Sequence, residues 1–141
     1  MTMLCSLCIV LASCSSGPGK VTITIKSVGN EMKYDLTRFE VKPGQKVTII
    51  MQNKANVAVM KHNVVLLSDK DAVDEVGKAA LTAKDYLPNH PAIIASTPIA
   101  GPGEQKKVTF KAPQKPGEYI YICTYPGHYM TMQGIMVVKE S

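Results

Sequence analysis

Apolar and polar side chains alternate along several short stretches of the chain. Residues 21–26 place Val or Ile at every second position, with Thr or Lys between them. This period of two predicts a strand that buries one face. Similar runs rich in Val, Ile and Thr, separated by Gly and Pro, predict further strands. They lie in residues 32–34, 39–41, 45–53, 59–67, 103–113, 117–124 and 133–139, with a shorter one in residues 92–97.

Residues 68–87 interrupt this pattern and predict the one helix of the chain. They contain few β-branched residues, and Ser68 or Asp69 offers an N-terminal cap. Apolar residues near helical spacing follow, namely Val73, Val76, Ala80 and Leu81. We expect a helix of two to three turns near residues 69–83. The whole pattern predicts an all-β fold, a Greek-key β-sandwich of seven to eight strands with one short helix inserted.

The first fourteen residues have a different character. They carry no charged side chain, and the apolar run from Met3 to Ala12 is too short to span a bilayer but suits a signal-peptide core. Residues 11–14 read Leu-Ala-Ser-Cys, which resembles the lipoprotein box of bacteria, where the cysteine is acylated and becomes the new N-terminus. A general secretion signal and a buried first strand are the alternatives.

These features predict the organisation of the chain. Residues 1–14 are expected to be a signal segment that ends at a lipidated Cys14, and residues 15–19, Ser-Ser-Gly-Pro-Gly, a flexible tether. Residues 20–141 are expected to form a single domain. The protein would then be exported and anchored by lipid to a membrane, on its periplasmic or extracytoplasmic face.

Charge and cysteine content restrict the function. The formal net charge is +5, but no basic run is interleaved with aromatic residues, which argues against nucleic-acid binding. A mildly basic surface suits an acidic protein partner. Three of the four cysteines lie in the first fourteen residues, so Cys123 has no intramolecular disulfide partner in the domain. A lone thiol in an oxidising compartment needs protection or a function.

Cys123 is close in sequence to two other residues that bind soft metals. His128 and Met132 follow it within ten positions, and the Pro126-Gly127 turn allows His128 to fold back toward the thiol. Each of the three residues taken alone is more often ordinary packing or surface. Their combination predicts a metal site that a strand end, a turn and the start of the last strand bring together.

Such a site needs a second nitrogen ligand, and the chain has three histidines. His90 lies between two prolines and is interpreted as a surface residue, which leaves His62, at the start of a predicted strand. Two His, one Cys and a weak axial Met form the pattern of blue copper electron-transfer sites. Zinc is less favoured because structural zinc sites use Cys and His without Met, although zinc can occupy the same ligands in vitro.

The spacing Cys-x4-His-x3-Met resembles the ligand loop of azurins, which belong to the cupredoxin family. The segment Met60-Lys61-His62-Asn63 and the segments DYLP, GEQKKVTF and CTYPGH also resemble azurin sequences, and auracyanins share the ligand spacing. The similarity extends from about residue 21 to residue 139. It implies a cupredoxin fold that holds one copper ion, Cu(I) or Cu(II), through His62, Cys123, His128 and Met132.

The resemblance also implies roles for residues around the copper. The carbonyl of Lys61, which stands where azurins have glycine, would be a weak further contact. Asn63 would connect the two ligand-bearing segments. The backbone N–H groups of Asn63 and Tyr125 would donate hydrogen bonds to the sulfur of Cys123 and tune the redox potential.

The hypothesis from the sequence is therefore a monomeric one-electron carrier that is not an enzyme. Its expected partners are redox proteins such as cytochromes or membrane respiratory complexes, which would dock on an apolar patch formed by Met60, Pro126, Tyr129 and Met130. A copper chaperone or storage protein with the same ligands is the alternative. Nucleophilic catalysis by a Cys–His pair is less favoured because no third orienting group is evident. A metal-free adhesion sandwich would leave the Cys/His/Met spacing unexplained.

Overall fold

The computed structural model describes residues 17–140 of the chain. Eight strands are present in this part, as the alternation predicted. They are β1 (Lys20–Lys26), β2 (Arg38–Val41), β3 (Lys46–Gln52), β4 (Val65–Leu67), β5 (Ile93–Ser96), β6 (Gln105–Lys111), β7 (Gly117–Ile122) and β8 (Gln133–Val138). The predicted signal segment and Cys14 lie outside the described residues.

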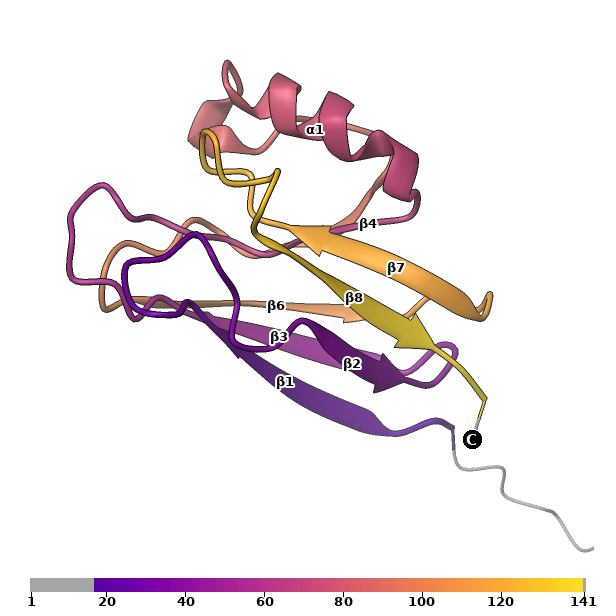
Figure 1. Ribbon diagram of the computed structural model, residues 1–141. Helices are drawn as coiled ribbons and strands as arrows, with labels where there is room; N and C mark the ends of the chain where they lie inside the picture. Colours follow the sequence, from indigo (N-terminus) through magenta and orange to yellow (C-terminus); the bar gives the residue numbers. More distant parts are fainter. Residues whose placement is uncertain (1–16, 141) are drawn as a thin grey trace, which may run out of the picture.

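The strands form two sheets that face each other (Figure 1). One sheet has the order β1-β3-β6, with β1 parallel to β3. The other has the order β2-β8-β7-β4-β5, with β2 parallel to β8. Alternate residues of each strand fill the space between the sheets, as Val47, Ile49 and Met51 do from β3. These observations confirm the predicted β-sandwich.

The predicted helix is confirmed, but it has three parts. A 3-10 turn η1 (Lys70–Ala72) leads into α1 (Val73–Ala80), and a second 3-10 turn η2 (Lys84–Tyr86) follows. The carboxylate of Asp69 accepts a hydrogen bond from the N–H of Asp71 and so caps the first turn. Helix α1 lies outside the sandwich against the five-stranded sheet, where buried Ala72 and Val76 join a second apolar cluster.

Two predicted strands are shorter in the structure than the sequence suggested. Residues 32–34 contribute only one bridge, between Ser27 and Tyr34. In residues 59–67 only β4 is a strand, and His62 forms an isolated bridge with Ala100. In the second of these segments side chains take part of the backbone hydrogen bonding. The N–H of Val64 donates to the hydroxyl of Thr97, and the carbonyl of Met60 accepts the amide of Asn53.

The two ends of the sandwich differ in what they carry. The start of β7 pairs with the end of β8, and the last residue of β7, Ile122, pairs with Gln133. The loops that follow β7 and β3 therefore lie at one end, and the first residue of β1 and the last residue of β8 lie at the other (Figure 1).

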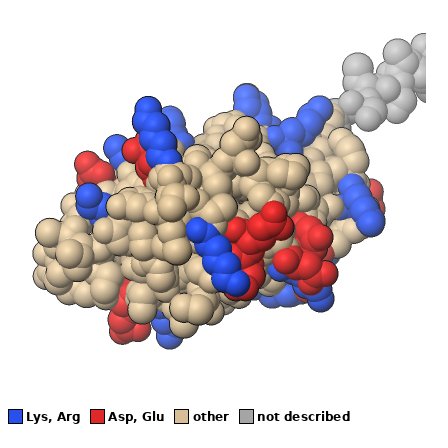
Figure 2. Space-filling view, turned by 90° about the horizontal axis from the view of Figure 1, so that it is seen from above, with Lys and Arg blue, Asp and Glu red and all other residues tan. Residues whose placement is uncertain are grey.

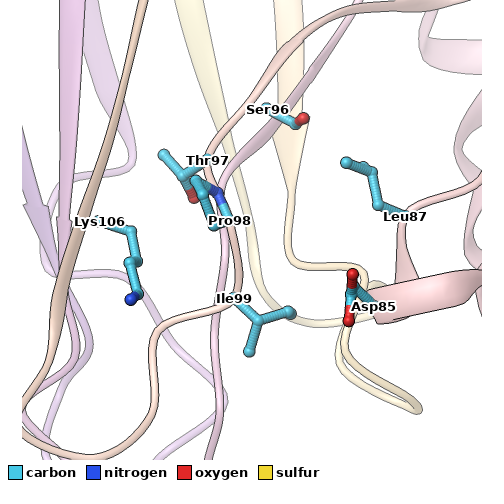
Figure 3. A pocket seen from close by; sticks show the side chains of 7 residues that line it. All are labelled: Asp85, Leu87, Ser96, Thr97, Pro98, Ile99 and Lys106. Carbon is cyan, nitrogen blue, oxygen red and sulfur yellow. The ribbon is translucent and has the colours of Figure 1, made fainter.

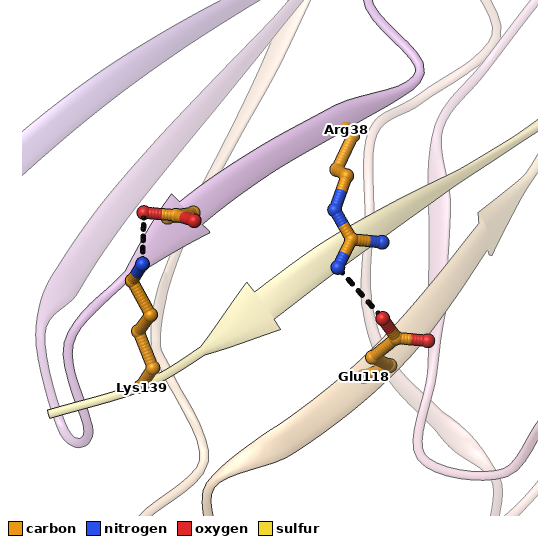
Figure 4. Close-up of polar contacts among 4 residues, drawn as sticks. Arg38, Glu118 and Lys139 are labelled. Carbon is orange, nitrogen blue, oxygen red and sulfur yellow. Dashed lines mark hydrogen bonds and ion pairs between the residues drawn. The ribbon is translucent and has the colours of Figure 1, made fainter.

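Ion pairs cross the exposed face of the strands near the second end. Arg38 pairs with Glu118 across β2, β8 and β7, and Lys139 pairs with Glu40 (Figure 4). All four side chains are more than half exposed, so each pair contributes at most about 1 kcal/mol to stability. Among residues 17–140, no helix has the length and apolar character needed to cross a bilayer.

Candidate metal centre

Three predicted ligands meet at the end of the sandwich where β7 terminates. The ligand atoms of His62, Cys123 and His128 all lie within 4.8 Å of one another. The sulfur of Cys123 is 3.9 Å from Nδ1 of His62 and 3.6 Å from Nδ1 of His128. All three side chains are buried. The two imidazoles therefore present the same nitrogen toward one thiol.

Backbone hydrogen bonds fold residues 123–132, here called the ligand loop, into a compact turn. The N–H of His128 donates to the carbonyl of Tyr125, and Gly127 between them has φ 81°, a value that favours glycine. The N–H of Met132 donates to the carbonyl of His128, and the N–H of Cys123 donates to the carbonyl of Met132. These bonds bring His128 back beside Cys123.

The donor atoms fit a soft or borderline transition metal such as copper. Bonds from a metal such as zinc to imidazole nitrogen and thiolate are about 2.0–2.3 Å long. Both nitrogen–sulfur distances, 3.9 and 3.6 Å, are shorter than two such bonds end to end, so an ion bound to the sulfur can also reach either nitrogen. A thiolate with two imidazoles suits copper in both of its common oxidation states.

The histidines are ready to bind a metal at neutral pH. Burial, assisted by the nearby His128, lowers the pKa of His62 from 6.5 to about 4. Burial also lowers the pKa of His128. Both rings are therefore neutral at pH 7 and offer a lone pair. Nε2 of His62 is buried without a hydrogen-bond partner among the described residues. Packing rather than a hydrogen bond therefore holds the ring on the side of this nitrogen.

The thiol of Cys123 must lose a proton before it can bind a metal. Burial raises its pKa to about 11, although hydrogen bonds from the backbone N–H groups of Asn63 and Tyr125 oppose this rise. The same two N–H groups are placed to stabilise a metal-bound thiolate. Metal binding is therefore coupled to release of the thiol proton.

Asn63 connects the segment of His62 to the segment of Cys123. Its side-chain carbonyl accepts the N–H of Thr124 at 2.8 Å, and its side-chain amide donates to the hydroxyl of Thr124 at 2.8 Å. Its backbone carbonyl accepts the hydroxyl of Tyr34 at 2.6 Å. All three residues are buried. Loss of the Asn63 side chain would leave two buried polar groups of Thr124 without these partners.

Sequence reasoning missed a second asparagine that supports the site. The side-chain amide of Asn53 donates to the carbonyls of Met60 and Ala100, at 2.7 and 2.9 Å. Ala100 in turn exchanges two backbone hydrogen bonds with His62. Asn53 follows β3 directly, and a buried asparagine at a strand end is the signal that could have identified it.

The remaining predicted site residues lie as follows. Met132 is fully buried in the same apolar cluster as Cys123. Lys61, beside His62, is exposed. His90 is partly buried and pairs with Glu75, so it lies outside the group of ligand atoms.

The predicted docking residues separate into two groups. Met130 is 66% exposed, and Met60 and Pro126 are partly exposed. Tyr129 is also partly exposed, but it packs against the apolar cluster under helix α1 and donates a hydrogen bond to Asp74. The sequence interpretation overlooked three further exposed apolar side chains in loops of the described chain, namely Met32, Val57 and Val59. Figure 2 shows that the left end, which carries the metal loops, has few charged side chains.

A surface hollow lies next to the helical segment but contains no predicted ligand. It is lined by Asp85 and Leu87, by residues 96–99 and by Lys106 of β6 (Figure 3). The side chains that line it include no histidine or cysteine. The three ligand side chains are buried elsewhere in the fold and do not line this hollow.

Comparisons with known proteins agree with this site. The family model for copper binding proteins of the plastocyanin/azurin family matches residues 21–139. Auracyanin-A of Chloroflexus aurantiacus is 41% identical over 156 residues, which cover 99% of this chain and 94% of that protein. Azurin of Pseudomonas aeruginosa is 35% identical over 118 residues, which cover 78% of this chain and 80% of that protein.

Solved structures show the same similarity. Auracyanin A of Chloroflexus aurantiacus, described as a "blue" copper protein, matches with a TM-score of 0.79 at 44% identity, over 85% of this chain and 99% of that chain. Dithionite-reduced auracyanin from Roseiflexus castenholzii matches with a TM-score of 0.78 at 37% identity, over 84% of this chain and 97% of that chain. The family and the group of ligands together support electron transfer by copper. The chain belongs to the plastocyanin/azurin family of copper-binding proteins, and copper is the metal that its His62, Cys123 and His128 are placed to bind.

Proposed function

We propose that this protein is a membrane-tethered one-electron carrier with a mononuclear type 1 copper site. The observation that carries the proposal is the buried group of His62, Cys123 and His128, in which two Nδ1 atoms face one sulfur. Copper supplies the chemistry, since the bound ion accepts and releases one electron. The protein residues hold the ion, exclude water and stabilise the thiolate charge.

The hydrogen bonds around the ligands suit this role. The Asn63–Thr124 pair and the backbone bonds of the ligand loop hold the ligand-bearing segments in one arrangement. When the ligands are already held in place before the metal binds, they move little when the charge on the metal changes. All three ligand side chains are buried. Burial restricts the access of a substrate to the metal, which favours a carrier over an enzyme.

An absorption spectrum tests the proposal directly. Addition of Cu(II) to the purified protein should produce an intense visible band from the thiolate–copper bond. Reduction should remove the band and reoxidation should restore it without loss of copper. Loss of copper on reduction, or its transfer to a metal-free acceptor, would indicate a copper-delivery protein instead.

We expect Met132 to tune the copper potential more than it contributes to binding. Met132→Leu should retain copper and raise the reduction potential, because loss of the weak thioether favours Cu(I). Met132→Gln should lower the potential, because an oxygen ligand favours Cu(II). Voltammetry of both variants measures the effect, and equal potentials in the two variants would show that Met132 is not a ligand.

We also propose that redox partners such as cytochromes or membrane respiratory complexes dock at the metal end of the protein. The proposal is supported by the exposure of Met130, Val57 and Val59 and by the low charge of this end. Small apolar patches of this kind suit transient complexes that must dissociate after each electron transfer.

Met130→Glu tests this surface. A buried or partly desolvated charge at the contact should slow electron exchange with a redox protein, while the visible band stays unchanged because Met130 is exposed. Stopped-flow measurements over a range of ionic strengths give the rate. Thr22→Glu, at an exposed residue near the start of β1 and so toward the end away from the metal loops, is a control for added charge. An unchanged rate in Met130→Glu at every ionic strength would place the contact on another face.

The membrane tether is proposed from residues 11–14, which match a lipoprotein box. Cys14→Ala, expressed in a bacterial host, should lose labelling by radioactive palmitate, since acylation needs the thiol. Wild type expressed in parallel is the control. Equal labelling of the variant and the wild type would rule out Cys14 as the lipidated residue.

A further inference from the structure

The helical segment, residues 69–87, touches the ligand loop next to two of its ligands, Cys123 and His128. One contact is made by Tyr129, the residue after His128, which packs against helix α1. The other is made by Thr124 and Tyr125, the residues after Cys123, which contact Tyr86 at the end of the segment. The segment is therefore in contact with the loop at two points that flank the ligands.

At the first contact, Gly77 makes room for the aromatic ring of Tyr129. A Cβ atom built on Gly77 would overlap the Cγ, Cδ1 and Cδ2 atoms of that ring. Gly77 lies in the middle of α1, where glycine weakens a helix relative to alanine. The helix thus carries a residue that disfavours it at a position where the ring of Tyr129 lies against the backbone.

Polar contacts hold Tyr129 at its hydroxyl and at its backbone carbonyl. Its hydroxyl donates to the carboxylate of Asp74 on α1 at 3.2 Å. Its backbone carbonyl accepts the side-chain amide of Gln133 at 2.7 Å. Because His128 is the preceding residue, fixing Tyr129 restricts where the backbone can place the imidazole of His128.

At the second contact, a strained turn reaches toward the loop. Asp85 and Tyr86 have φ angles of 54° and 56°, which non-glycine residues rarely adopt. The carbonyl of Tyr86 accepts the hydroxyl of Thr124 at 2.7 Å. Backbone strain of this kind persists where surrounding contacts hold it in place.

A chain of aromatic rings links this strained turn to a ligand. The ring of Tyr86 lies edge-on to the ring of Tyr125, with centroids 5.1 Å apart. The ring of Tyr125 lies edge-on to the imidazole of His128, with centroids 5.0 Å apart. These distances and tilts are those of favourable aromatic pairs. Tyr86 is thus connected to His128 through one intervening side chain.

We infer that the helical segment is a two-point clasp that positions the ligand loop, with Gly77 and Tyr86 as the positioning residues. The clasp fixes His128 relative to Cys123 before a metal binds. It thereby sets the geometry that the copper ion must accept, a consequence that rests on the proposed function. The positioning itself concerns the metal-free protein and stands apart from that function.

Gly77→Ala in the full chain is the first test. The added methyl group should displace the ring of Tyr129 and loosen the loop. In the metal-free protein, amide hydrogen exchange at Cys123, His128 and Met132, whose N–H groups bond within the loop, should accelerate at least tenfold. In the Cu(II) protein, the visible band and the electron paramagnetic resonance parameters should shift.

Two further variants separate positioning from general helix stability. Ala79→Gly weakens the same helix at an exposed residue and should leave the loop amides and the visible band unchanged. In the Tyr129→Ala background, Gly77→Ala should have no further effect on exchange, because the ring it displaces is gone. Tyr129→Ala also serves if Gly77→Ala does not fold, since it removes the same contact without a clash and should accelerate exchange at His128 and Met132.

The inference is overturned if Gly77→Ala folds and leaves loop exchange unchanged, or if Ala79→Gly accelerates it to the same degree. It is also overturned if Tyr129→Ala leaves exchange at His128 unchanged. A wild-type protein that stays colourless with Cu(II) would refute the proposed copper function. The exchange data from the metal-free protein would still decide whether the clasp positions the loop.

Discussion

Replacing Cys123 with serine should abolish the intense visible absorption of the Cu(II) protein. The band requires a thiolate bound to copper, and a serine hydroxyl does not ionise in this buried position. The side chain is completely buried beside the two imidazoles, so no other thiol of the described chain can substitute for it. A titration with Cu(II), followed by absorption spectroscopy, measures the loss.

Circular dichroism of the metal-free Cys123→Ser protein is the control for folding. Serine is nearly the same size as cysteine and can accept the hydrogen bonds that the N–H groups of Asn63 and Tyr125 donate to the sulfur. We therefore expect the fold to survive. A folded serine variant that keeps the full band would show that Cys123 is not the thiolate ligand.

The metal-free protein should lose about 3 kcal/mol of stability between pH 7 and pH 4 through His62 alone. The pKa of this ring is about 4 in the folded state and 6.5 as an ordinary histidine. As the pH falls below 6.5, the unfolded chain takes up a proton that the folded protein does not. The free energy of unfolding therefore falls with pH through this window and levels off below pH 4.

Urea unfolding of the metal-free protein measures this loss. The measurements are made at several pH values from about 7.5 to about 4, which is roughly the window that the two pKa values of His62 define. His62→Gln removes the titrating ring and should flatten the slope between pH 6.5 and pH 4. A wild-type free energy of unfolding that stays constant over this window would show that burial does not keep His62 neutral. Copper should raise the free energy of unfolding at neutral pH, since a ligand that binds only the folded state stabilises it.

Much of the fold could be predicted from local pattern. Alternation located β1, β3 and β8 because one face of each strand packs in the sandwich, and burial follows the period of two. Pattern failed at residues 32–34 and 59–64. In the second segment the backbone bonds to side chains such as Thr97, and no periodicity in the sequence reveals such partners.

In the candidate site, too, residues close together in the sequence could be predicted to meet, whereas contacts between distant residues could not. Cys123 and His128 could be found because one tight turn joins them, whereas His62 needed elimination and resemblance. The positions of Tyr129 and Met130 could not be derived from their order in the loop. Gly77, fifty-two positions before Tyr129, leaves the space that the ring of Tyr129 fills. Val57 and Val59 escaped notice because apolar residues are expected in cores.

Both ends of the described chain leave the sandwich on the side away from the metal loops. Strand β1 has seven residues and so spans roughly 20 Å, which separates its first residue from the end that carries His62 and Cys123. A fusion partner, affinity tag or surface linker joined directly before residue 17 or after residue 140 would start from the end opposite the metal loops. Molecules attached to an electrode through such a linker would all turn their metal-bearing end toward the solution.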